Sequence, residues 1–166
     1  MNKINRRSQL REAAFLILFR NDFHTDEDFK EQIEDFFEGE ECFTEKEKEI
    51  ICAKVTGTVS KLNEIDNILN EVSIGWKTRR ITKVDLTALR LACYEIQYDD
   101  SVPTAAAINE AVELVKNYGM ESSGSFVNGI LAKVVKKISD PQEQITDEME
   151  ERVSSDESCD NETENS

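Results

Sequence analysis

Basic side chains gather at the start of the sequence, at Lys3, Arg6, Arg7 and Arg11. A guanidinium group presents a planar fork of N–H donors, so the chemistry these residues offer is the binding of a phosphate or another oxyanion. Arg7 and Arg11 are four residues apart, which predicts that both project from one face of a helix. Cations in a first turn oppose the helix dipole, at a cost of about 0.3 to 1 kcal/mol each. The cluster therefore indicates an external anion, with a solvated helix end as the alternative.

A second stretch with binding chemistry is SSGSFVNGIL, residues 122–131. Ser122 and Ser125 can cap the free N–H groups at a helix start, which is the simplest interpretation. The same helix start is also a favourable place for an anion. Glycine inside a helix costs about 1 kcal/mol relative to alanine, so Gly129 predicts that another backbone packs closely there. Phe126 is then a candidate packing residue beside the site.

Residue types that carry catalysis are sparse. The single histidine, His24, lies in an acidic stretch, and neither a G-x-S-x-G motif nor a glycine-rich phosphate loop is present. The cysteines have no metal-ligand spacing and are typical of reduced thiols in a cytosolic protein; they are Cys42, Cys52, Cys93 and Cys159. The sequence predicts a cytoplasmic protein that is not an enzyme and holds neither a metal nor a cofactor.

The charge is distributed unevenly along the chain. The formal net charge is −15, and residues 142–166, with ten acidic side chains and Arg152, account for −9 of it. Charges act over about 8 to 10 Å at physiological salt, so the basic start can bind an anion despite the acidic tail. The tail has few apolar residues to bury, which predicts a helical domain over residues 1–140 and a disordered segment over residues 141–166. The longest apolar run, AAFLILF, falls far short of the roughly 20 residues that cross a bilayer, so no membrane association is expected.

Apolar residues recur every three or four positions, which favours helices throughout. Ser8 is the expected cap of the first helix, and Ser122 opens the last. Capping boxes are predicted at Thr25–Asp28, Thr44–Glu47 and Thr82–Asp85, and Pro103 and Gly119 bracket one further helix. One long helix is expected to run from Thr44 through Leu69. The predicted fold is a compact all-α bundle of about seven helices.

Several of these motifs together resemble the NusB family of bacterial transcription antitermination factors. The resembling segments are RRSQLREAAFLILF, VDLTALRLACYEI, VPTAAAINEAVELVKNYG and SSGSFVNGIL, within residues 5 to about 138. The resemblance implies two three-helix bundles that share a first helix region. It also implies a pairing with NusE, a small-subunit ribosomal protein, to bind the boxA element of nascent ribosomal-operon RNA. That complex helps RNA polymerase read through terminators. A homodimer is left open.

The resemblance also implies roles for individual residues. The expected RNA contacts are Lys3, Arg6, Arg7, Arg11, Ser122, Ser125 and Phe126, and the residues expected to face NusE are Phe19 and Asp85. The chain departs from the family pattern at Ser8, which interrupts the arginine run, and at Ser125, where a lysine is common. Phe19 stands in place of a frequent tyrosine, and the acidic tail has no counterpart. The departures at Ser8 and Ser125 predict RNA binding that is weaker or depends more on the partner, whereas Phe19 keeps the apolar contact and loses a hydroxyl.

Two other functions stay open from the sequence. The chain could be a helical adaptor whose arginines contact an acidic protein without specific RNA binding. NusB-like domains also occur fused to RNA methyltransferases, which would make the chain part of an RNA-modifying enzyme. No cofactor motif supports that second alternative.

Overall fold

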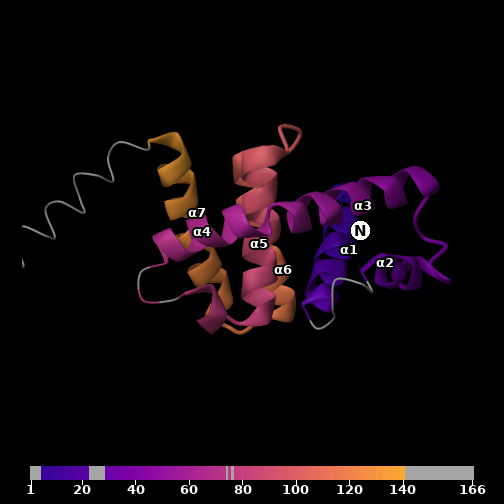
Figure 1. The fold of residues 1–166 in the computed structure, drawn as a ribbon, viewed down its shortest axis with the longest axis horizontal. Coiled ribbons are helices and arrows are strands. Elements are labelled where there is room, and N and C mark those ends of the chain that lie inside the picture. Colours follow the sequence, from indigo (N-terminus) through magenta and orange to yellow (C-terminus); the bar gives the residue numbers. More distant parts are fainter. Residues whose placement is uncertain (1–4, 23–28, 74, 76, 141–166) are drawn as a thin grey trace, which may run out of the picture. The chain divides into compact units, whose positions relative to one another are not determined.

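The computed structural model describes residues 5–22, 29–73, 75 and 77–140, and within them it contains helices and no strand. The elements are α1 (Arg6–Asn21), α2 (Phe29–Phe37), α3 (Glu45–Ser60), α4 (Leu62–Val72), the short 3₁₀ helix η2 (Thr78–Arg80), α5 (Lys83–Tyr98), α6 (Thr104–Tyr118) and α7 (Ser123–Ser139) (Figure 1). The all-α prediction is confirmed. Lys3, His24, the Thr25–Asp28 capping box and the acidic tail lie outside the described residues.

The chain forms two compact units, Met1–Val134 and Val135–Ser166. In the first unit, α1 packs against α2, α3 and α5, while α5 also packs against α3, α4 and α6. The helices therefore fall into an α1–α3 group and a second group around α5, joined through α1. The part of α7 in this unit adds Val127 and Leu131 to the same hydrophobic core. In the second unit, the described part is the last turn of α7, which ends with a bond from the Asp140 N–H to the Lys136 carbonyl.

Two helix starts form as predicted and one is shifted. Thr44 caps α3 in a capping box with Glu47, and the Thr82 side chain accepts the N–H of Asp85 at the start of α5. The first helix is capped by Asn5 rather than Ser8, because the Asn5 side chain accepts the Arg7 N–H at 3.1 Å. Ser8 instead donates its hydroxyl to Glu110 on α6, at 2.7 Å. The shift places Arg6 and Arg7 inside the first turn of α1.

The predicted single helix from Thr44 through Leu69 is wrong. Lys61, with φ −111° and ψ 10°, ends α3 and begins α4. The Lys61 N–H bonds the Thr58 carbonyl, and its own carbonyl accepts from Ile65, so the hydrogen bonding continues past the break. Apolar residues keep their helical spacing across Lys61, which is why the sequence pattern does not reveal the break.

Candidate nucleic-acid interface

The direction of α6 relative to α1 follows from two contacts between them. Near the start of α1, Ser8 bonds Glu110. In the second half of α1, the ring of Phe15 lies 5.4 Å from the ring of Tyr118, the last residue of α6. The two helices therefore run in the same direction, and the start of α7, where Gly124 lies against Val112 and Lys116, adjoins the second half of α6.

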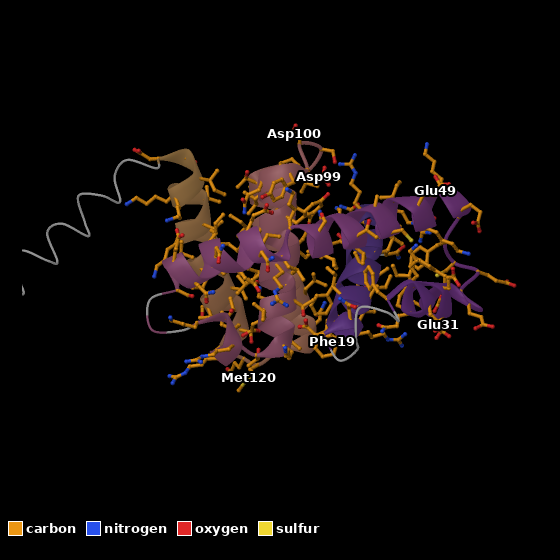
Figure 2. All side chains as sticks on the ribbon, in the orientation of Figure 1. Phe19, Glu31, Glu49, Asp99, Asp100 and Met120 are labelled. Atoms are coloured by element: carbon orange, nitrogen blue, oxygen red, sulfur yellow. The ribbon has the colours of Figure 1, made fainter. Side chains whose placement is uncertain are left out.

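Helix α5 runs the opposite way. Arg11 on α1 pairs with Glu95 near the end of α5, whereas Asp22 after α1 pairs with Arg90 at 3.1 Å and with Lys83, at the start of α5, at 3.6 Å. The last turns of α1, the start of α5, the end of α6 and the start of α7 thus meet at one end of the first unit, which we call the Phe19 end. Figure 2 shows Phe19 and Met120 toward one edge of the view and Asp99 and Asp100, just after α5, toward the other.

Arg6 is held by groups of the chain itself. Its guanidinium donates from Nε to Glu47 Oε1 and from Nη2 to Glu47 Oε2, both at 2.7 Å, and from Nη2 to the Cys42 carbonyl at 2.6 Å. It also lies 5.2 Å from the centre of the Phe43 ring. The hydrogen bond from Arg6 and that from the Thr44 N–H lower the pKa of Glu47 to about 2. The anion that Arg6 requires is therefore present within the molecule.

Arg11 is buried in a second internal ion pair. Its exposed fraction is 7%, and it makes a two-pronged contact with Glu95, with Nε 2.8 Å from Oε1 and Nη2 2.7 Å from Oε2. Lys54 lies 3.1 Å from the same Glu95, and Glu110 lies 3.6 Å from Arg11. Burial alone lowers the pKa of Arg11, but the hydrogen bonds and charges of Glu95 and Glu110 outweigh it and raise that pKa above its usual value. This network joins α1, α3, α5 and α6.

Arg7 has a different environment from Arg11, although the sequence predicts a shared face. Its side chain is exposed to solvent in the first turn of α1, while Arg11 is buried. Carboxylates of the chain itself thus compensate for the unfavourable interaction of Arg6 and Arg11 with the helix dipole. No external anion is needed to explain why these two arginines are there. Among the described arginines of this cluster, Arg6 and Arg7 are exposed, and Arg7 has no ion pair to another described side chain.

The start of α7 presents hydroxyls and one aromatic ring at the Phe19 end. Ser122 and Ser125 are exposed, Phe126 is half-buried, and Ser125 donates to the Ser122 carbonyl at 3.2 Å. Ser123, the first residue of α7, is buried, and its hydroxyl accepts the Met120 N–H at 3.0 Å. Tyr118, at the end of α6 just before the α7 start, contacts α1 at Glu12 and Phe15, whereas Arg6 and Arg7 lie in the first turn of α1.

The prediction of a close backbone contact at Gly129 is wrong. A Cβ atom at Gly129 would have open space within 4 Å. The close approach occurs instead at Gly57 on α3, where a Cβ would overlap the hydroxyl of Tyr94 on α5. Neither arrangement can be inferred from the glycine itself, because both are helical positions with ordinary backbone angles.

Apolar side chains are exposed at the Phe19 end. Tyr118, the last residue of α6, is 42% exposed, and Met120, between α6 and α7, is 66% exposed. The Tyr118 hydroxyl donates to Glu12 at 2.5 Å, and this bond raises the pKa of Tyr118 to about 12. Phe19 is half-buried and stacks on Phe15, with ring centres 6.3 Å apart. This surface offers aromatic faces suited to stacking or to an apolar partner.

Asp85, predicted to face NusE, has an unsatisfied oxygen. The residue is 6% exposed in the first turn of α5, and its Oδ1 has no hydrogen-bond partner among the described residues. A buried acceptor without a donor is unfavourable by about 1 to 3 kcal/mol. A donor brought by a partner molecule would relieve this.

Four cations missed by the sequence analysis also belong to this region. They are exposed and lie between the end of α4 and the start of α5; they are Lys77, Arg79, Arg80 and Lys83. The signal that could have found them is the run WKTRRITK, which contains no acidic residue. The described helices include none that is long and apolar enough to cross a membrane. Over the same described ranges, no three acidic, histidine or cysteine side chains gather to hold a metal.

Comparison with known proteins places these features in a family. Residues 8–136 match the profile described as the NusB family. The chain is 48% identical over 129 residues to the transcription antitermination protein NusB of Lachnoclostridium phytofermentans, covering 78% of this chain and 98% of that protein. It is 46% identical over 127 residues to the NusB of Agathobacter rectalis, covering 76% and 97%.

Solved structures agree. The T. maritima NusB structure superposes with a TM-score of 0.73 at 36% identity, covering 79% of this chain and 91% of that one. A structure of the antitermination factors NusB and NusE in complex with double-stranded RNA superposes with a TM-score of 0.70 at 29% identity, covering 78% and 96%. Sequence motifs, helix arrangement and relatives all lead to the same conclusion: the chain belongs to the NusB family.

Proposed function

We propose that this chain is a transcription antitermination factor that, together with NusE, binds boxA-type RNA in nascent ribosomal-operon transcripts and supports read-through by RNA polymerase. It acts in the cytoplasm, as a binding protein and not as an enzyme. Residues 1–140 are the RNA-binding domain, and residues 141–166 are an acidic appendage. Its relatives carry the name antitermination protein, and a similar structure contains NusE and RNA.

The observation that carries the proposal is the composition of the Phe19 end. Exposed Tyr118 and Met120 lie there beside the hydroxyls of Ser122 and Ser125 and the ring of Phe126. Single-stranded RNA is recognised through bases that stack on aromatic rings and hydrogen-bond with polar groups, so this surface matches that ligand.

The proposed partner contacts are Phe19 and Asp85. Phe19 offers a half-buried ring, and Asp85 offers a carboxylate oxygen that lacks a donor within the described residues. A donor from NusE at Asp85 gives the pairing directional specificity, because a wrong partner leaves that oxygen unsatisfied.

The three arginines have different tasks in this proposal. Arg7 contacts RNA phosphate directly, and Lys3 lies just ahead of it in sequence. Arg6 and Arg11 position the helix through Glu47 and Glu95 and keep the surface of α1 in place. With few direct phosphate contacts, binding by this chain alone is modest and salt-sensitive, and NusE supplies the remainder.

The test is binding of labelled boxA RNA and of a scrambled RNA, with and without NusE, to wild type, Arg7→Glu and Phe126→Leu. Leucine keeps the apolar packing at position 126 and removes the stacking ring. We expect selective binding that NusE strengthens and that both variants weaken, with Lys46→Glu, at an exposed site on α3, as the unaffected control. Equal binding of the two RNAs by wild type would instead identify a protein-binding adaptor.

A further inference from the structure

The segment between α4 and α5 carries the largest group of exposed cations that the described structure leaves without close carboxylates. Lys77, Arg79 and Arg80 are exposed, and none of them has a hydrogen bond or ion pair to another described side chain. Lys83 is 3.6 Å from Asp22, with about half of its own side chain exposed, which is a weak surface pair. Arg6 and Arg11, by contrast, pair with carboxylates of the same chain.

The backbone around the three exposed cations at positions 77–80 makes hydrogen bonds to defined partners, unlike that of an ordinary charged loop. Gly75, with φ +82°, turns the chain after α4. The Thr78 N–H donates to the side chain of Asn70 on α4 at 2.9 Å, and the Arg80 N–H donates to the Lys77 carbonyl at 2.8 Å. Ile81 is buried in the core. Arg79 and Arg80 therefore belong to a short helix that Thr78 joins to α4 and that Ile81 joins to the core, and an ordered backbone reduces the entropic cost of binding.

The position of the segment agrees with a role in binding. Lys83 reaches Asp22 at the end of α1, so the segment adjoins the Phe19 end. Exposed Tyr118 approaches the same half of α1 through Phe15. An RNA strand whose bases stack at the start of α7 reaches this region if its phosphodiester backbone runs toward the start of α5.

We infer that Lys77, Arg79, Arg80 and Lys83 form a phosphate-binding surface for the RNA backbone, separate from the basic start of α1. Guanidinium forks at Arg79 and Arg80 fit phosphate oxygens in pairs, while the two lysines act as point charges. The interaction is independent of base sequence: it adds affinity and fixes the path of the strand. The inference rests on the proposed function and names where on the protein the RNA backbone lies.

The experiment compares RNA binding over a series of salt concentrations for wild type, Arg79→Gln/Arg80→Gln and Arg79→Lys/Arg80→Lys. Removing one interaction with a phosphate makes the slope of log affinity against log salt less steep by about 0.7, which is about fivefold in affinity at 0.1 M salt. We expect the glutamine variant, which removes two such interactions, to bind RNA about 25-fold more weakly. We expect the lysine variant to keep the slope, because its charge is unchanged.

The matched control is Lys46→Gln/Lys133→Gln, which removes two exposed charges from α3 and α7. Circular dichroism establishes that each variant is folded, and NusE binding is measured without RNA. If wild type binds boxA RNA with NusE and the Arg79→Gln/Arg80→Gln variant binds it equally, or no more weakly than the control, the inference is overturned and the proposed function stands. Loss of NusE binding in the absence of RNA also overturns it, since the surface then contacts protein. Failure of wild type to bind RNA rejects the proposed function itself.

Discussion

Arg11 and Glu95 form an ion pair that is almost completely shielded from water, with exposed fractions of 7% and 1%. A charge at such a position is tolerated because its partner supplies two hydrogen bonds, and Lys54 adds a third contact to the same carboxylate. The pair joins the first helix to α5. At the scale of single residues, then, Arg11 holds in place the helix that carries Arg7.

Replacing Arg11 tests that role. Arg11→Met leaves Glu95 buried without its main partner, and breaking a buried pair in this way lowers the free energy of unfolding by about 3 kcal/mol. The measurement is urea unfolding, with exposed Arg7→Met as the control, expected within about 0.5 kcal/mol of wild type. In Arg11→Met/Glu95→Gln, the decrease should be smaller than the sum of the decreases in the two single variants. Additive decreases would show that the two residues are not coupled.

The protonation of Glu47 makes the stability of the folded protein depend on pH. Its pKa is about 2 in the folded protein and about 4.5 in its ordinary range, since Arg6 and the Thr44 N–H bond the charged form. A carboxyl with a lowered folded pKa contributes stability above pH 4.5, and that contribution is lost as pH falls toward 2. Across this pH window, we expect the free energy of unfolding to decrease less for Glu47→Gln than for wild type. Thermal unfolding of both proteins at a series of pH values measures this difference. If stability falls equally with pH in the two proteins, Glu47 does not have the lowered pKa.

At the scale of elements, helix contacts decide which glycines are structural. The α3–α5 contact brings Tyr94 against Gly57, whereas Gly129 on α7 has open space. Both lie in helix interiors, where the sequence alone does not distinguish them.

The two glycines therefore respond oppositely to alanine. Gly129→Ala should raise the free energy of unfolding by about 0.5 to 1 kcal/mol, because alanine loses less backbone entropy on folding. Gly57→Ala should lower it by about 1 to 3 kcal/mol, because the new methyl group overlaps the end of the Tyr94 side chain and forces that ring out of its packed position. Denaturant unfolding measures both. Equal stabilisation at both sites would mean that Tyr94 moves aside freely.

At the scale of the whole molecule, charge opposes the proposed ligand. The net charge is −15, yet the surface proposed for RNA includes Arg7 and the cations at positions 77–83. The attraction between RNA phosphates and the cations that they contact can exceed the repulsion from more distant acidic residues, because the screening length is about 10 Å at 0.1 M salt.

Removing residues 141–166 tests this balance. The truncated chain loses −9 of the net charge, so its affinity for RNA should rise at low salt and converge with that of the full chain near 1 M salt, where screening acts within about 3 Å. Its unfolding midpoint should match that of the full chain, because the removed segment has few apolar residues. Unchanged affinity at low salt would show that the tail does not weaken RNA binding.

The sequence by itself determined the local features of this protein. The all-α fold, the caps at Thr44 and Thr82 and the helix end at Gly119 all follow from residues within four positions of one another. Such features depend on backbone geometry and on the period of the apolar residues, both of which are visible in a single chain. The NusB motifs were visible in the same way.

Only the tertiary structure decided which cations are available. Arg6 bonds Glu47, which is 41 residues away in the sequence, and Arg11 bonds Glu95, which is 84 residues away. The break at Lys61, the open space at Gly129 and the exposed arginines beside α5 were settled in the same way, by which helices pack together. An ion pair or a close contact joins groups that are distant in sequence, so the type and spacing of residues on one helix cannot specify the partner that another helix brings.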